Sequence, residues 1–194
     1  MNKQIFLATN NKGKLAEYRE ILAPMGFVIY SPKDLNIDLD VEETGTTYRE
    51  NSFLKANAFR KIVPFPVLSD DSGLEIDALN NFPGLFSSRF AESCGGYPQA
   101  YEELFRRLEG KDRSAHFRCC ICYVESPDAK PLYFEGICPG RILNAPSGDH
   151  GFGYDPIFHC DEIDQDFGLV DEATKNKYSH RAKALQKLKL FFAI

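Results

Sequence analysis

The chain has 194 residues, of which 43% are hydrophobic and 26% are charged. This length fits one domain or a closely joined pair, and the composition excludes intrinsic disorder and collagen-like structure. Lysine and arginine number 23 against 28 acidic residues, which leaves a net charge of -5. Such a chain is a poor candidate for a broad nucleic-acid-binding surface, although a local phosphate site remains compatible with it.

No apolar run approaches the roughly 18 to 20 residues that a membrane span needs. The apolar stretch near the N-terminus is only four residues long before polar residues follow. We therefore expect neither a membrane helix nor a signal peptide, and we expect a cytoplasmic protein.

The cysteines do not have the spacing of a zinc site. Residues 116–124 are predicted to form a strand, on which Cys119 and Cys122 would point to opposite faces and could not share one tetrahedral ion. No second pair with the same spacing follows. Buried free thiols in a reducing cytoplasm are the expectation for all six cysteines, which are Cys94, Cys119, Cys120, Cys122, Cys138 and Cys160.

The first half of the sequence alternates predicted strands and helices. Strands are expected at 5–8 and 28–30, and a helix is expected at 15–22 after a polar loop. Thr47, followed three residues later by Glu50, forms a capping box that predicts the start of a second helix.

The second half adds further strands and a hairpin, so the predicted class is α/β with a mixed sheet. We expect short strands at 67–68 and 74–79 separated by a polar turn at 69–73, a helix at 97–108, a hairpin of 115–124 with 132–138, a further strand at 140–143, a glycine-rich loop at 148–153 and a closing helix at 179–192.

The loop at 9–14 is the first candidate binding element. It joins a buried strand to a helix N-terminus, where backbone N–H groups and the helix dipole favour an anion, and Lys12 and Lys14 add positive charge. The loop matches neither the Walker motif nor GxGxxG. A capped turn with solvated lysines is the alternative interpretation.

Two acidic pairs form the second candidate element. Asp70 and Asp71 lie between apolar segments, and Glu42 and Glu43 precede a helix. Because ligands gather at strand ends in α/β sheets, the aspartates could lie near the phosphate loop and hold Mg²⁺ there. Acidic pairs are also common on solvated surfaces, and that alternative stays open.

The third candidate element combines the segment at 151–156 with Lys175, His180 and Arg181. An exposed Phe152 ring could stack on a base, and the cationic side chains could donate to a carbonyl or phosphate oxygen. The alternatives are a core role for Phe152 and a helix-capping or surface role for His180.

Taken together, these segments resemble the inosine triphosphate pyrophosphatases, the Ham1-like family. The resemblance spans nearly the whole chain in the family's order. The matching blocks are FLATNNKGK at 6–14, EETG at 42–45, EN at 50–51, SDDSGL at 69–74, PG at 83–84, SSR at 87–89, GFGYDPIF at 151–158 and SHR at 179–181.

The resemblance implies an elongated α/β fold over residues 1–194, a single domain in which two lobes flank a central nucleotide-binding cleft. It implies Mg²⁺-dependent hydrolysis of noncanonical purine nucleotides, ITP, dITP and XTP, to the monophosphate and pyrophosphate. The implied assembly is a homodimer, with no nucleic acid or membrane as partner.

Individual roles also follow from the resemblance. Asp71 is the implied proton acceptor and Mg²⁺ ligand, Lys14 is the implied catalytic lysine, and Glu42 is the implied second metal ligand, with Glu43 one residue away. The implied substrate-binding residues are Thr9, Asn10, Asn11, Lys12, Gly13, Lys14, Ser72, Phe152, Gly153, Tyr154, Asp155, Lys175, His180 and Arg181.

The chain departs from the family pattern at a few positions, among them Asn10, the pair at 81–82 and Ala182. None of these changes removes a group that the chemistry needs. Two rival functions remain to be weighed. One is a nucleotide-binding sensor without turnover, and the other is a haloacid-dehalogenase-type phosphatase, because residues 38–41, DLDV, are close to the DxDxV motif.

Overall fold

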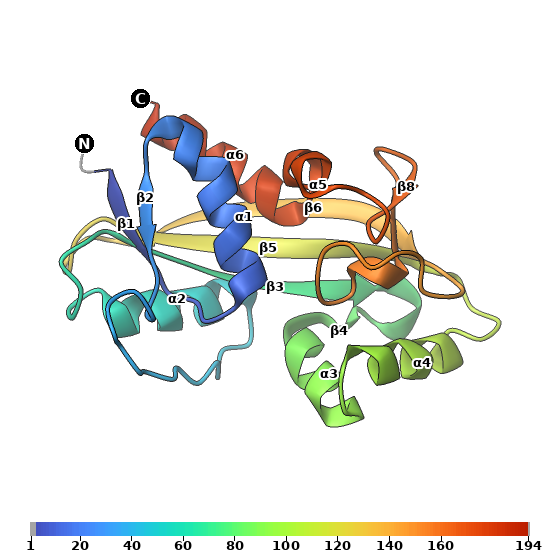
Figure 1. Cartoon of the computed structure of the whole chain (residues 1–194). Coiled ribbons are helices and arrows are strands. Elements are labelled where there is room, and N and C mark those ends of the chain that lie inside the picture. The colour runs from blue at the N-terminus through green and yellow to red at the C-terminus, as the bar shows by residue number, and fades with distance from the viewer. Residues whose placement is uncertain (1–2, 194) are drawn as a thin grey trace. The chain divides into compact units, whose positions relative to one another are not determined.

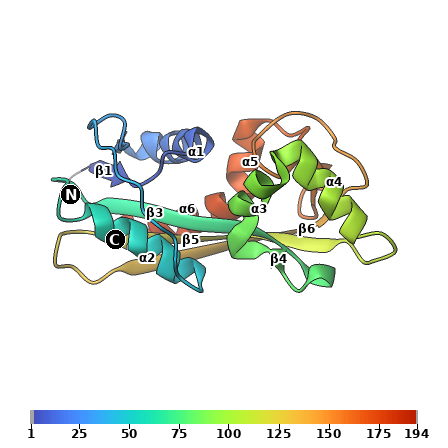
Figure 2. The same ribbon diagram turned by 90° about the horizontal axis from the view of Figure 1, so that it is seen from below.

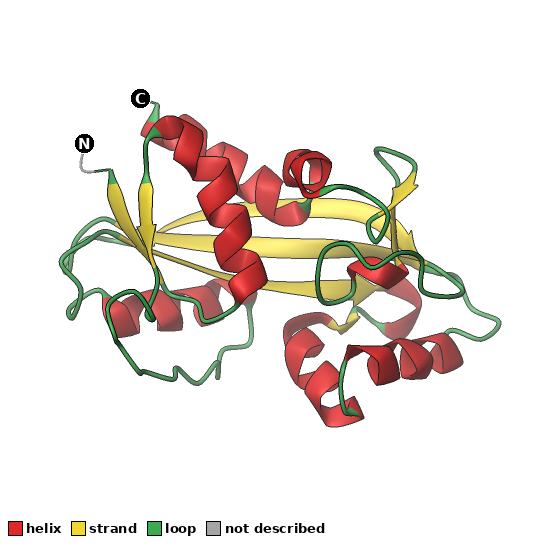
Figure 3. Cartoon of the chain, in the orientation of Figure 1, coloured by secondary structure: helices red, strands yellow, loops and turns green. Residues whose placement is uncertain are grey.

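The computed structural model describes residues 3–193, whose strands pair in one eight-stranded mixed sheet (Figures 1 and 3). The pairing order is β2-β1-β3-β5-β6-β7-β8, with β4 on β3. The strands are β1 Gln4–Leu7, β2 Val28–Tyr30, β3 Val67–Ile76, β4 Phe82–Pro83, β5 Ser114–Val124, β6 Leu132–Ile142, β7 Phe158–Cys160 and β8 Gln165–Asp166. The helices are α1 Lys12–Leu22, α2 Tyr48–Phe59, α3 Ser87–Cys94, α4 Tyr97–Arg107, α5 Glu172–Tyr178 and α6 His180–Phe192. The α/β class with a mixed sheet is thereby confirmed.

The chain divides into two compact units. Unit 1 comprises residues 1–71, 119–135 and 184–194, and unit 2 comprises residues 72–118 and 136–183. Strands β3, β5 and β6 each contribute residues to both units.

Unit 1 has a buried cluster on each face of its strands. Helices α1 and α6 cover one face and α2 covers the other (Figures 1 and 2). The two-residue period of β1 explains this arrangement, because Ile5 and Leu7 pack toward α1 and α6 while Phe6 packs toward α2. A strand that is buried on both faces has a continuous run of apolar residues in its sequence, as β1 does.

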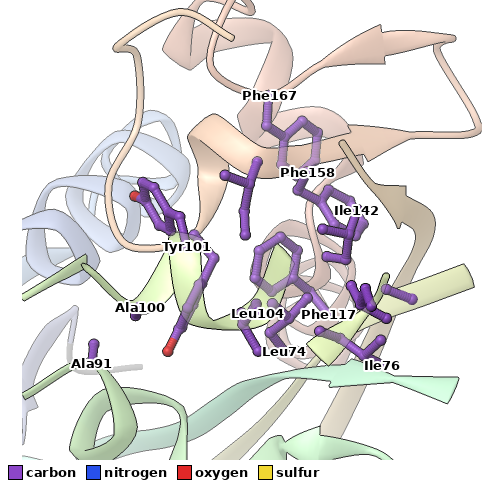
Figure 4. Packing of buried hydrophobic residues seen from close by; sticks show 14 of the residues in the cluster. Leu74, Ile76, Ala91, Ala100, Tyr101, Leu104, Phe117, Ile142, Phe158 and Phe167 are labelled. Carbon is purple, nitrogen blue, oxygen red and sulfur yellow. The ribbon is translucent and has the colours of Figure 1, made fainter. Parts of the chain in front are cut away.

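Unit 2 has an aromatic core (Figure 4). Phe117 of β5 lies 4.4 Å from Phe158 and 6.3 Å from Phe167, measured between ring centroids. Leu104 of α4 and Phe90 of α3 join this cluster, and the two helices pack against each other. The amphipathic helix predicted at 97–108 therefore buries its apolar face as expected.

The predicted helix starts are largely confirmed. Thr47 caps α2 by accepting a hydrogen bond from the backbone N–H of Glu50, and the Glu50 carboxylate accepts from the N–H of Thr46. Helix α1 begins at Lys12, three residues before its predicted start. Asn11 caps it by accepting from the N–H of Lys14, so the polar loop is shorter than expected.

The turn predicted at 69–73 is wrong, because β3 runs unbroken from Val67 to Ile76. Ser69, Asp70 and Asp71 are buried and Ser72 is half-buried, and neighbouring groups supply their partners. The Ser69 hydroxyl donates to the carbonyl of Ser52 at 2.5 Å. Tertiary hydrogen bonding thus replaces the solvent that a turn would have needed.

Several short elements were not predicted, namely α3, α5, β4, β7 and β8. They are at most eight residues long, so each offers little sequence in which to detect a pattern, and packing holds them in place, as Phe90 and Ala91 of α3 show in the core of unit 2. The strand predicted at 140–143 forms the end of β6.

All six cysteines are free, and five of them are buried. Cys119 packs toward α1 and α6 while Cys122 packs toward α2, so the predicted opposite orientation is confirmed. Within residues 3–193, no helix has the length and apolar character that crossing a bilayer requires.

Candidate active site

The segment between β1 and α1 forms a capped helix start, a geometry that favours anions. The Thr9 hydroxyl oxygen accepts from the N–H of Asn11 at 3.1 Å, and the Asn11 side chain accepts from the N–H of Lys14 at 3.0 Å. The first-turn N–H groups of Lys12 and Gly13 have no acceptor within the helix. Asn10, Asn11 and Lys12 are exposed, so this end of α1 is open to solvent.

Asp70 and Asp71 point to opposite faces of β3, as adjacent residues of a strand must. Asp70 lies on the α1 side, where its Oδ1 accepts from Lys14 Nζ at 2.9 Å. Asp71 lies on the α2 side, where its Oδ2 accepts from Asn51 Nδ2 at 3.1 Å. Both carboxylates are buried, with exposed fractions of 2% and 5%.

Burial raises the pKa of Asp71 to about 6. The positive charge of Lys55 opposes this shift, the negative charge of Glu43 adds to it, and Lys14 and the Asn51 hydrogen bond oppose it. The carboxylate is thus incompletely compensated by its surroundings. A pKa near neutrality is what a general base needs in order to be both ionised and able to accept a proton.

Of the two adjacent glutamates, Glu43 is the one that interacts with the residues around Asp71. Lys55 Nζ forms an ion pair with Glu43 Oε1 at 3.1 Å and also donates to the backbone carbonyl of Asp70. Glu42 is exposed, whereas Glu43 is half-buried and its charge raises the pKa of Asp71.

A divalent cation fits these carboxylates only if other groups complete its shell. Within the described residues, no group of three or more His, Cys, Asp or Glu side chains is arranged to hold a metal ion. Mg²⁺ is usually held by one or two carboxylates, with substrate phosphates and water as the remaining ligands. Burial disfavours the ionised form of Asp71, and a cation beside the carboxylate would stabilise that form.

In unit 2, the loop at 151–155 surrounds a buried ion pair. Lys175 Nζ lies 2.6 Å from Asp155 Oδ2, and the same oxygen accepts from the N–H of Phe152 at 2.9 Å. The Lys175 ammonium also lies 4.5 Å from the centre of the Phe152 ring. Gly151 is required here, because its φ is +74° and a Cβ would lie 2.1 Å from Asp155 Oδ2.

The start of α6 places two further predicted residues. Arg181 is 1% exposed, and its Nη2 donates to the Ser72 hydroxyl at 3.0 Å. Its guanidinium carbon lies 5.9 Å from the centre of the Phe152 ring. The His180 ring stacks on Phe117 with centroids 4.8 Å apart and an angle of 16° between the planes.

The structure places Gly153 and Tyr154 in core contacts. The Tyr154 hydroxyl donates to the carbonyl of Ser87 at 2.6 Å, and its ring is buried. The Gly153 carbonyl accepts from the Tyr101 hydroxyl. Unit 2 therefore gathers Ser72, Phe152, Asp155, Lys175 and Arg181, whereas Tyr154 supports their loop from the core.

Two residues near the carboxylates, Asn51 and Lys55, were absent from the predicted site, and Asp70 was a member of a candidate acidic pair without an individual role. Asn51 also accepts from the N–H of Gly45 at 2.7 Å, which ties the EETG segment to α2. A signal was present in the sequence, because residues four apart lie on the same face of a helix and Asn51 and Lys55 follow the capping box.

The rival phosphatase motif does not have the required setting. Residues 38–41 lie in a loop without a strand before them, whereas the nucleophile of that class follows a buried strand. The structure therefore gives the partial similarity to DxDxV no support.

Comparisons with known proteins cover nearly the whole chain. A sequence model of the Ham1 family matches residues 5–191. A protein from Halalkalibacterium halodurans, named dITP/XTP pyrophosphatase, is 43% identical over 189 residues, which cover 96% of this chain and 97% of the relative. A protein of the same name from Dictyoglomus thermophilum is 41% identical over 196 residues, covering 98% and 95%. The solved Staphylococcus aureus Ham1 protein matches with a TM-score of 0.86 at 36% identity, covering 98% of each chain. This chain belongs to the Ham1 family.

Proposed function

We propose that the protein hydrolyses ITP, dITP and XTP to the nucleoside monophosphate and pyrophosphate, with Mg²⁺ as cofactor. The observation that carries this proposal is the buried Asp71, whose pKa is raised to about 6 beside Lys14, Lys55 and Glu43. Two relatives that are more than 40% identical carry the name dITP/XTP pyrophosphatase.

The triphosphate is assigned to residues of unit 1. Segment 9–14 binds the phosphate oxygens through backbone N–H groups. The Lys14 ammonium has three hydrogens, so it can donate to phosphate while it keeps its hydrogen bond to Asp70. Asp71 accepts the proton of the attacking water. The water oxygen bonds to the α-phosphorus, the bond from that phosphorus to the bridging oxygen breaks, and pyrophosphate leaves.

Bound Mg²⁺ would neutralise charge on the triphosphate. Asp71 is one proposed ligand, and the second is Glu42 or Glu43. The ion pair of Glu43 with Lys55, and its effect on the pKa of Asp71, favour Glu43. The matched variants Glu42→Gln and Glu43→Gln separate the two. We expect Glu43→Gln to raise the Mg²⁺ concentration for half-maximal activity at least about tenfold and Glu42→Gln to leave it nearly unchanged. The reverse result would assign the role to Glu42.

The base is assigned to residues of unit 2. Phe152 offers a ring for stacking, and His180 and Arg181 supply donors for a purine with an oxygen at position six. Adenine presents an amino group there, which would leave those donors unpaired and so disfavour ATP. Ser72 and Lys175 complete the proposed set of substrate contacts.

Product identification tests this function. The pure protein is incubated with Mg²⁺ and ITP, XTP, GTP or ATP, and products are separated by anion-exchange chromatography. IMP with pyrophosphate supports the proposal, IDP with phosphate would indicate a phosphatase, and unchanged ITP would indicate a sensor. Asp71→Asn serves as the inactive control and should retain nucleotide binding.

The family resemblance also leads us to propose a cytoplasmic homodimer that binds neither nucleic acid nor membranes. Light scattering coupled to size exclusion tests the assembly. A single peak with the mass of one chain at micromolar concentration would contradict the dimer.

A further inference from the structure

Asp70 is held from two sides within unit 1. Its Oδ1 accepts from Lys14 Nζ at 2.9 Å, and its Oδ2 lies 3.6 Å from Cys119 Sγ, within hydrogen-bonding distance of a thiol. The Asp70 side chain is 1% exposed and Cys119 is fully buried. A thiol therefore contacts the same carboxylate that holds the lysine of the phosphate-binding segment.

The strand geometry explains why only one thiol of β5 reaches this carboxylate. Strands β3 and β5 are neighbours in the sheet, and Cys119 lies on the face covered by α1 and α6, as do Leu68 and Asp70. Cys122 lies on the opposite face, in the apolar cluster under α2. Cys119 and Cys122 thus share residue type, strand and burial, and they differ in the hydrogen bond to Asp70, which Cys119 makes.

A buried ion pair is stable only when the remaining lone pairs of the carboxylate also have partners. The Cys119 thiol supplies a hydrogen to Oδ2, while its sulfur remains compatible with the apolar neighbours of α1 and α6. Contacts at both oxygens restrict rotation of the carboxylate plane. The direction of Oδ1, and with it the position of Lys14 Nζ, then depends on Cys119.

We propose that Cys119 is a positioning residue, whose thiol orients Asp70 so that Asp70 presents the Lys14 ammonium to the substrate triphosphate. This inference rests on the proposed function, in which Lys14 binds the triphosphate.

Four variants test the inference: Cys119→Ala, Cys119→Ser, Cys122→Ala and Cys122→Ser. In Cys119→Ala we expect the KM for ITP to rise about tenfold with kcat changed less than about twofold, which corresponds to about 1.4 kcal/mol of binding. Calorimetry with Mg²⁺ and pyrophosphate should show a similar rise in Kd. Simple loss of folded protein would lower the active fraction and leave both KM and Kd unchanged.

The serine variants provide the rescue. Cys119→Ser keeps a donor, although its shorter bond sets the hydroxyl back, so we expect KM within about threefold of wild type. At position 122 we expect the serine variant to be less stable than the alanine variant, because a hydroxyl in an apolar cluster destabilises the fold more than alanine does. Thermal unfolding of each variant reports folding separately from binding.

The inference is overturned if Cys119→Ala and Cys122→Ala give the same KM and pyrophosphate Kd, or if Cys119→Ser binds no better than Cys119→Ala. Failure of the proposed function looks different, because the wild-type protein itself would then neither hydrolyse ITP nor bind pyrophosphate.

Discussion

Replacing Asp71 with asparagine is expected to stabilise the metal-free protein at neutral pH. The side chain is buried, and its pKa is raised from 3.8 to about 6. Below pH 3.8 the carboxyl is protonated in both the folded and the unfolded chain. Between 3.8 and about 6 only the unfolded chain ionises, so the free energy of unfolding falls by about 1.4 kcal/mol for each pH unit. Above pH 6 the loss is complete and amounts to about 3 kcal/mol.

Asparagine has nearly the same shape and carries no charge, so the variant avoids this loss. It can still offer an oxygen to Asn51 Nδ2, which lies 3.1 Å from Asp71 Oδ2. Urea unfolding of both proteins in EDTA, at steps from about pH 4 to about pH 8, measures the difference directly. Taking the difference between the two curves removes the contribution of every other titrating group.

We expect the variant to exceed wild type by up to about 3 kcal/mol at pH 8 and by little near pH 4. Adding Mg²⁺ should narrow the gap at pH 8, because the cation stabilises the protein that still has the carboxylate. A difference that is absent, or that does not change with pH, would refute the reasoning that the buried charge of Asp71 is incompletely compensated.

Two further predictions concern unit 2. Lys175→Met leaves Asp155 buried without its cation and should lower the free energy of unfolding by about 3 to 5 kcal/mol at pH 7. Adding Asp155→Asn to this variant should recover part of the lost stability. Urea unfolding measures both changes, and a double variant with no recovery would count against the ion pair. Phe117→Leu removes the ring on which His180 stacks and should reduce the preference for ITP over ATP about fivefold. Phe167→Leu changes the same aromatic cluster and should leave that preference unchanged. The same ratio of kcat/KM for ITP to kcat/KM for ATP in both variants would contradict the role of the stack.

Local patterns predicted the elements that depend on local interactions. The strand at 28–30 and the helix starting after Thr47 were predicted from apolar runs and a capping box, which act over a few residues. Helix α1 begins at Lys12 and not at its predicted start because Asn11 caps it, so this difference between prediction and structure also has a local cause.

The continuity of β3 could not be predicted in this way. Residues 69–73 are polar and small, and such runs are typical of turns. Ser52 and Asn51 of α2 and Lys14 of α1 supply the partners that keep this segment in the sheet. Those partners are distant in sequence, so no local pattern contains them.

The sequence by itself determined the family of this protein and most of its candidate site, since the motif blocks stand in order along the chain. Only the tertiary structure decided that Asp70 and Asp71 face opposite sides of one strand, that Glu43 rather than Glu42 pairs with Lys55, and that Cys119 contacts Asp70. The physical reason is that pKa values and hydrogen bonds depend on burial and on neighbours across the sheet, whereas motifs record only the order of residues along the chain.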